Sequence, residues 1–143
     1  MEQAARVIVE TLFRALESRD MAAALDTFAE DAVIFDPHYP TPQMSGREAI
    51  GEGLAWGLSV MKSFGFRTVR FYGFFFNDTA TTEIYTNHVL NTGQELSFPQ
   101  AFFVETRDGK IAGLRAYEPY GPNGLGGFFL GLERLKRRIV GRR

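Results

Sequence analysis

A carboxylate ends a short apolar run in the N-terminal third of the chain, in the sequence Val33-Ile34-Phe35-Asp36-Pro37. β-Branched and aromatic residues favour a strand, and proline ends strand pairing because it has no N–H to donate. This pattern predicts that Asp36 is held at the end of a strand, beside apolar neighbours. An aspartate in that position is a candidate general base for a pocket. The alternative is an aspartate that only caps the turn before Pro37.

His38 and Tyr39 follow in the same loop. Because histidine exchanges protons near neutral pH, His38 is a candidate proton shuttle or ligand-orienting donor, and the alternative is a loop histidine at a pocket rim. Glu118 is the third catalytic candidate, since it shares strand parity with inward residues of its strand. The alternative for Glu118 is a solvated acid at a strand end. His88, the other histidine, is expected on the surface.

Three N-terminal helices are expected to position these groups. Apolar residues recur with helical spacing in residues 4–18, and a short second helix is predicted over 21–28. Ser45 and Glu48 have the spacing of a capping box, which predicts a third helix that runs to about residue 62.

From Phe66 onward the apolar period changes to two, which is typical of strands. Gly93 and Gly109 lie in predicted hairpin turns, because glycine readily supplies positive φ. Residues 74–86, FFFNDTATTEIYT, are similar to a translated sequencing-adapter string, so no chemistry is assigned to them. Four strands are predicted, over residues 66–75, 81–91, 95–107 and 110–118.

This order of elements predicts an α+β fold, with a curved and mostly antiparallel sheet wrapped around the three helices. The expected domain is residues 1–122, followed by a basic amphipathic helix within 123–143 that packs on or beside it. The residues expected to line an apolar pocket are Leu12, Phe13, Tyr39, Trp56, Ala101, Phe103, Leu114 and Ala116.

The C-terminal helix has a separate apolar stripe, at Leu125, Phe128, Leu132, Leu135 and Ile139. The favoured interpretation is a lid that folds back over the open end of the domain. The alternative is a weak contact with an anionic membrane surface, where apolar burial and basic charge act together.

Composition limits the classes of function. The chain has 143 residues, of which 45% are hydrophobic, and this is enough for one domain with a real core. There is no cysteine and the two histidines stand apart, so neither a metal site nor a cofactor is indicated. No signal peptide or membrane span is seen, which makes a cytoplasmic location the expectation.

Charge is unevenly distributed along the chain. Residues 133–143 hold six basic residues and one acid, whereas the rest of the chain is acidic on balance. An acidic body argues against a nucleic-acid partner.

Three phrases carry a resemblance to a known family: FAEDAV at residues 28–33, GREAI at 46–50, and RDGKI at 107–111 leading to RAYEP at 115–119. Together with the element order, they resemble the SnoaL-like branch of the NTF2-like superfamily, which includes polyketide cyclases and ketosteroid isomerases. The resemblance implies a cone of bent sheet and three helices around an apolar pocket, in a homodimer. It covers roughly residues 4–120.

The resemblance also implies roles for individual residues. Asp36 matches the position of the isomerase base, while the two oxyanion donors of that mechanism would fall on Leu12 and near Ala101, both apolar here. Glu118 is the nearest match to the acid of the cyclase branch. Two functions follow: a cofactor-independent isomerase, cyclase or dehydratase acting on a small hydrophobic molecule, or a non-catalytic ligand-binding or scaffold module of the same fold.

Overall fold

The computed structural model describes residues 2–74, 78–118 and 124–141. Its elements follow the predicted order, with two short strands added. They are α1 (Glu2–Glu17), α2 (Met21–Asp26), β1 (Phe28–Phe35), β2 (Gln43–Ser45), α3 (Arg47–Val60), β3 (Met61–Ser63), β4 (Phe66–Phe74), β5 (Thr79–Leu90), β6 (Glu95–Arg107), β7 (Lys110–Tyr117) and α4 (Gly124–Val140).

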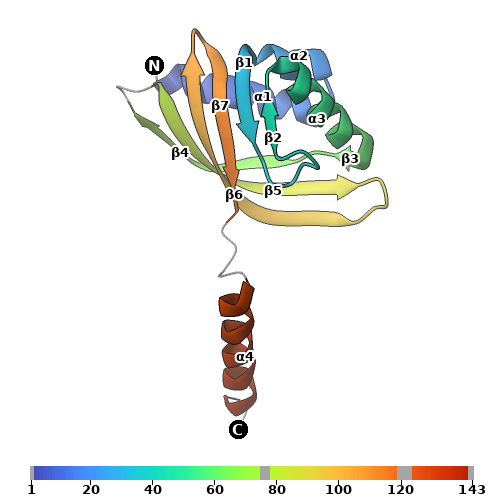
Figure 1. The fold of residues 1–143 in the computed structure, drawn as a ribbon, viewed down its shortest axis with the longest axis vertical. Coiled ribbons are helices and arrows are strands. Elements are labelled where there is room, and N and C mark those ends of the chain that lie inside the picture. Colours follow the sequence, from blue (N-terminus) through green and yellow to red (C-terminus); the bar gives the residue numbers. More distant parts are fainter. Residues whose placement is uncertain (1, 75–77, 119–123, 142–143) are drawn as a thin grey trace.

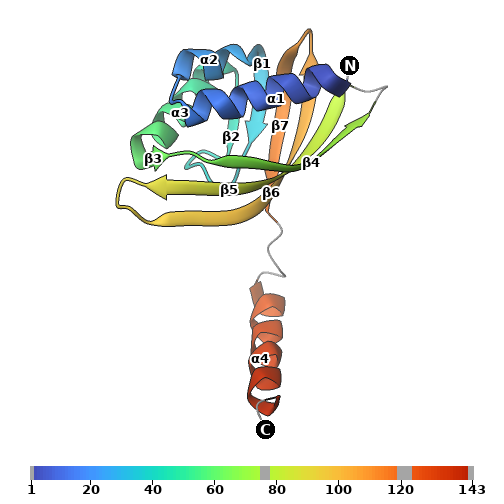
Figure 2. The same ribbon diagram turned by 180° about the vertical axis from the view of Figure 1, so that it is seen from behind.

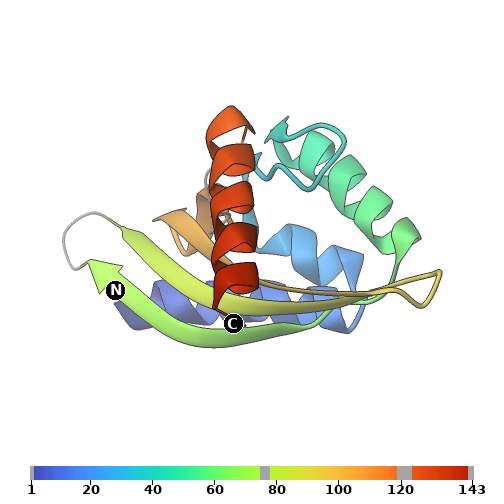
Figure 3. The ribbon, with the colours of Figure 1, turned by 90° about the horizontal axis from the view of Figure 1, so that it is seen from below.

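The strands form one curved sheet, and the helices α1, α2 and α3 lie against its concave side (Figures 1 and 2). The order is β2-β1-β7-β6-β5-β3, and β4 also pairs with β5. The pair β1–β7 is parallel and the other pairs are antiparallel. Figure 3 shows how strongly β4 and β5 bend. The predicted α+β cone is therefore confirmed.

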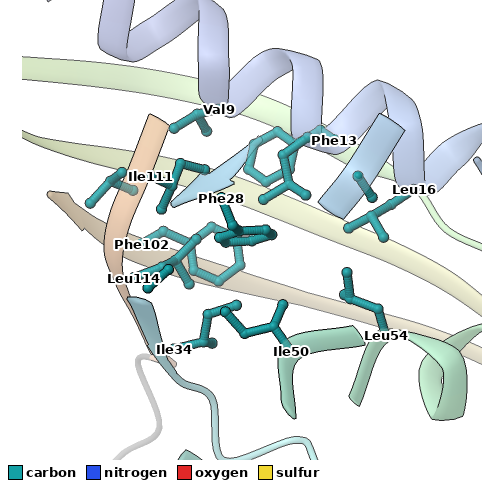
Figure 4. Packing of buried hydrophobic residues seen from close by; sticks show 14 of the residues in the cluster. Val9, Phe13, Leu16, Phe28, Ile34, Ile50, Leu54, Phe102, Ile111 and Leu114 are labelled. Carbon is teal, nitrogen blue, oxygen red and sulfur yellow. The ribbon is translucent and has the colours of Figure 1, made fainter. Parts of the chain in front are cut away.

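The core lies between the sheet and the helices. α1 contributes Val9, Phe13 and Leu16 from one face, and these side chains meet Phe28 and Phe102 of the sheet (Figure 4). The Phe13 ring stacks on Phe66 at a centroid distance of 4.6 Å. The spacing of four and three residues along α1 is what places its apolar side chains on one face.

The start of α3 differs from the prediction. Its N-cap is Gly46, with φ of +87°, and no side chain caps the helix. Ser45 is not available as a cap because it belongs to β2 and pairs with Val33. The predicted capping box is therefore wrong. The helix also ends at Val60, because Met61 begins β3 and pairs with Leu90.

β5 is the most heavily paired strand of the sheet, since β3, β4 and β6 all pair with it. Residues 79–86 of this strand belong to the adapter-like segment and keep the alternation of a half-buried strand, with Ala80, Thr82, Ile84 and Thr86 buried. The Thr82 hydroxyl is buried without a hydrogen-bond partner in the described part of the chain.

α4 confirms the predicted C-terminal helix, but it stands apart from the cone (Figures 1 and 2). Its stripe residues Leu125, Phe128, Leu135 and Ile139 are exposed. The structure does not show the helix packed on the domain, and its role as a lid stays a prediction. No helix of the described residues is long and apolar enough to cross a membrane.

Candidate functional site

A cavity of about 360 Å³ opens between the helices and the concave face of the sheet. Its wall is mostly apolar, with residues from α1, α3, β1, β5, β6 and β7. Leu12, Phe13, Tyr39, Trp56 and Leu114 line it, as predicted from the sequence. Polar groups also reach the cavity, and they are Asp36, His38, Tyr39, His88 and Gln100.

Backbone hydrogen bonds fix Asp36 at the end of β1. Its N–H donates to the carbonyl oxygen of Pro42 at 2.9 Å, and its own carbonyl oxygen accepts from the Tyr39 N–H at 3.2 Å. The carboxylate Oδ1 accepts the His38 backbone N–H at 3.0 Å. The turn-capping and pocket-lining interpretations of Asp36 are thus both satisfied, because one oxygen caps the loop while the side chain lines the cavity.

The His38 ring lies between two carboxylates. Its Nδ1 is 2.6 Å from Asp36 Oδ1, and its Nε2 contacts Glu118 Oε1. The ring also stacks on Phe98, with centroids 5.2 Å apart. The three predicted catalytic candidates therefore form one chain of contacts, although Glu118 is 80 residues from His38.

The parallel pairing of β1 with β7 explains this meeting. Phe35 is in register with Arg115, so both strands end at the same edge of the sheet. Asp36 follows one strand and Glu118 follows the other. The Glu118 side chain is only 2% exposed, against 13% for Asp36 and 32% for His38. Glu118 is therefore a buried carboxylate and not a solvated strand end.

Two acceptors around one imidazole favour its doubly protonated form, because each ring N–H then has a carboxylate to bond. The pKa of His38 is raised above its ordinary value, chiefly by the hydrogen bond to Asp36 and also by the charges of Asp36 and Glu118, against the lowering effect of burial. The second oxygen of Glu118, Oε2, is buried without a hydrogen-bond partner among the described residues.

Gln100 lies beside this network on the sheet. Its side-chain Nε2 is 3.2 Å from His38 Nδ1, and its Oε1 accepts a hydrogen bond from the Thr86 hydroxyl at 3.2 Å. Gln100 and Thr86 are both buried. Sequence analysis missed Gln100 because it assigned the opposite face of β6 to the cavity.

A β-bulge causes that error. A continuous register from the turn at Gly109 would pair Phe103 with Leu114 on the inward face. In the structure the register shifts between Glu105 and Thr106, so Val104 pairs with Leu114 instead. A shift of one residue moves a whole strand face from inside to outside.

Three predicted lining residues lie elsewhere, two of them because of this shift. Phe103 is 42% exposed and, like Ala101, lies on the outer face of β6, while Phe102 lines the cavity. The assignment of Ala101 and Phe103 to the cavity wall is therefore wrong. Ala116 is buried in the core but is not part of the cavity wall.

His88 also differs from its prediction, since it lines the cavity and does not lie on the surface. Its ring meets Phe64 and Phe66 edge to face, with centroids 5.1 and 5.0 Å away. Burial lowers the pKa of His88 to about 4. The alternation of β5 would have indicated this inward position, because His88 shares the face of Ile84 and Thr86.

The arrangement is suited to proton transfer. Asp36 offers a carboxylate to the cavity, and His38 links it to the buried carboxylate of Glu118. Within the described ranges, no group of three histidine or acidic side chains is arranged to hold a metal ion.

Comparison with known proteins places this chain in a family. A family model described as a SnoaL-like domain matches residues 9–114. The chain belongs to the SnoaL-like family. A search of curated proteins found no match.

Solved structures of the same fold agree. A putative polyketide cyclase from Xanthomonas campestris superposes with a TM-score of 0.72 at 22% identity, covering 84% of this chain and 92% of that one. An LEH-like epoxide hydrolase of Mycobacterium tuberculosis gives a TM-score of 0.70 at 19% identity, with 97% of both chains covered. A second M. tuberculosis protein, in complex with estradiol-17β-hemisuccinate, gives 0.71 at 16% identity and covers 80% and 92%. At these identities the likeness to this SnoaL-like chain is one of fold.

Proposed function

We propose that this SnoaL-like protein binds a small hydrophobic molecule in its cone and transfers a proton on it, with Asp36 as the base. The observation that carries the proposal is the Asp36–His38–Glu118 chain, which ends on an otherwise apolar cavity. Apolar walls hold a ligand by burial, while a few placed polar groups fix its orientation.

In this proposal Asp36 removes a proton from a carbon next to a carbonyl group. The His38 imidazolium offsets the negative charge of the two carboxylates and orients Asp36. Because Leu12 and Ala101 offer no donor, the developing enolate oxygen needs another group. The Tyr39 hydroxyl is a candidate, since burial, followed by the charge of Asp36, raises the pKa of Tyr39 and keeps it protonated.

Hydrogen–deuterium exchange tests this chemistry without knowledge of the physiological substrate. A panel of cyclic ketones is incubated in D₂O, and exchange at the carbon next to the carbonyl is followed by NMR. Wild type is expected to accelerate exchange in at least one ketone, and Asp36→Asn is expected to lose about 10²-fold or more of that acceleration.

Asp31→Asn is the matched control, because Asp31 is an exposed carboxylate on the same strand that pairs with Arg107. It should retain the wild-type rate. Equal rates in wild type and Asp36→Asn would overturn Asp36 as the base.

The alternative function is a ligand-binding or scaffold module without chemistry. The apolar residues at the two oxyanion positions of the isomerases favour it, and so does the steroid ester bound by one structure of the same fold. If wild type binds the ketones but accelerates hydrogen–deuterium exchange in none of them, this alternative is supported.

A homodimer is part of the proposal. The outer face of β1, β6 and β7 exposes Val33, Phe35, Phe103 and Tyr117, and the last two rings lie edge to face at 5.2 Å. Apolar patches of this kind mark interaction sites. Light scattering at micromolar concentration should give twice the mass of one chain for wild type. For Phe103→Asp it should give the mass of a single chain.

α4 carries a further part of the proposal, because its exposed apolar stripe requires a partner. We favour closure over the cone, and a weak contact with anionic membrane is the alternative. Truncation after Gly124 should weaken ketone binding and lower stability if α4 is a lid. Loss of salt-sensitive binding to anionic vesicles, with ketone binding and stability unchanged, would instead support the membrane contact.

A further inference from the structure

His88 has no role in the proton transfer proposed above, although it lines the same cavity. Strand alternation places it on the concave face of β5 with Ile84 and Thr86, which are both buried. Leu90, two residues further along this face, lines the cavity as well. The His88 ring can therefore contact a ligand that binds in the cavity.

A backbone hydrogen bond fixes which ring nitrogen of His88 carries the proton. The Gly65 N–H donates to His88 Nδ1 at 3.1 Å, so Nδ1 is the acceptor. In the neutral ring the proton must then sit on Nε2. A second backbone hydrogen bond holds the donor beside β5, because the Asn87 N–H donates to the Gly65 carbonyl oxygen at 2.9 Å.

The surroundings keep this ring uncharged. Phe64 and Phe66 flank it edge to face, and burial lowers the pKa of His88 to about 4. Among the described residues, the hydrogen bond that the geometry gives this ring is the one from the Gly65 N–H to Nδ1. A ligand that displaces water from this apolar cavity must supply an acceptor or leave the N–H donor unpaired, which is costly.

We infer that His88 Nε2–H is a ligand-recognition donor, which selects hydrophobic molecules that carry a neutral oxygen acceptor, such as a ketone carbonyl, toward the Phe64–Phe66 side of the cavity. This inference rests on the proposed function in one respect, that the ligand binds inside the cone. An acceptor oxygen satisfies the donor that a pure hydrocarbon leaves unpaired. An ammonium group, which offers no acceptor, would be rejected.

A matched pair of probes tests this inference: 2-decalone and 2-methylenedecalin. The second compound has a methylene group in place of the carbonyl oxygen. Wild type is expected to bind the ketone about tenfold more tightly, the value of one neutral hydrogen bond. His88→Phe should reduce this preference by weakening ketone binding alone, while the Tyr39 hydroxyl remains as a second donor in the cavity. The preference is measured by binding alone, so that failure of the proton-transfer chemistry does not imply failure of this inference.

A measurement on wild type covers the case in which His88→Phe does not fold. The ¹H and ¹⁵N signals of the His88 Nε2–H group should shift downfield when the ketone is added and not when the methylene analogue is added. Equal affinity of wild type for the two probes, including no measurable binding of either, would overturn the inference. So would an unchanged Nε2–H signal in the presence of saturating ketone.

Discussion

His38 and His88 line one cavity in different surroundings. His38 lies between Asp36 and Glu118 and is 32% exposed, and its pKa is raised. His88 is packed against Phe64 and Phe66 without a carboxylate contact, and its pKa is lowered to about 4. The same side chain is thus driven toward the cation at one place and toward the neutral ring at the other.

The difference shows how one apolar cone can hold two kinds of polar chemistry. A charged imidazole is retained where two strand ends deliver carboxylates and where water reaches the ring. A neutral imidazole results where only phenylalanine rings are near, because burial penalises the charged form. Proton transfer is therefore expected at His38, and hydrogen bonding by a neutral ring is expected at His88.

The largest expected effect is acid destabilisation by His88. Its folded pKa of about 4 lies below the unfolded value of 6.5, so the unfolded chain takes up the proton first as pH falls. Stability linked to His88 is complete above about pH 6.5 and is lost between pH 6.5 and 4, by about 3 kcal/mol. Urea unfolding should therefore show that the free energy of unfolding falls less between pH 7 and pH 4 in His88→Phe than in wild type.

His38→Gln is the comparison for this measurement, because the raised pKa of His38 makes its contribution to stability grow as pH falls, opposite in sign to that of His88. The loss of unfolding free energy between pH 7 and pH 4 should therefore be at least as large in His38→Gln as in wild type. If His88→Phe lost as much unfolding free energy between pH 7 and pH 4 as wild type, the neutral, buried state of His88 would be contradicted.

A smaller effect of opposite sign is expected for the His38 network. Because the folded pKa of His38 is raised, its contribution is fully present below pH 6.5 and is lost as pH rises through the folded pKa. Asp36→Asn should cost about 1 kcal/mol at pH 6, since the pair is partly exposed, and less at pH 9. Asp31→Asn, on the same strand, should show no such pH-dependent difference in unfolding free energy.

The smallest effect is expected from the phenylalanine rings. Phe64→Leu keeps an apolar neighbour but opens space beside His88, so the pKa of His88 should rise part of the way toward 6.5. The pKa of His38 should stay as in wild type. A titration of the variant by NMR measures both values, and a shift confined to His38 would contradict the separation of the two environments.

The sequence predicted the fold and the three catalytic candidates because these depend on local patterns. The apolar run before Asp36 and the alternation before Glu118 can be read from neighbouring residues. Their meeting at His38 depends on the parallel pairing of β1 with β7, which joins distant parts of the chain. No local pattern of residues specifies that pairing.

The errors have equally specific causes. The bulge opposite Glu105 reverses the faces of β6, so the parity that predicts Ala101 and Phe103 inside the cavity is wrong. The buried position of His88 depends on Phe64, Phe66 and the Gly65 backbone, which tertiary packing brings to β5. Ser45 lost its capping role to a short strand that pairs with β1. Each error arises where a long-range contact overrides a local preference.

The most direct test of this account is an NMR titration of the wild-type protein. The chain has two histidines, so two ring signals are expected, and His38→Gln assigns them. The account predicts that the His38 signal titrates above pH 6.5 and that the His88 signal stays neutral until about pH 4. Two histidines that titrate together near pH 6.5 would contradict it.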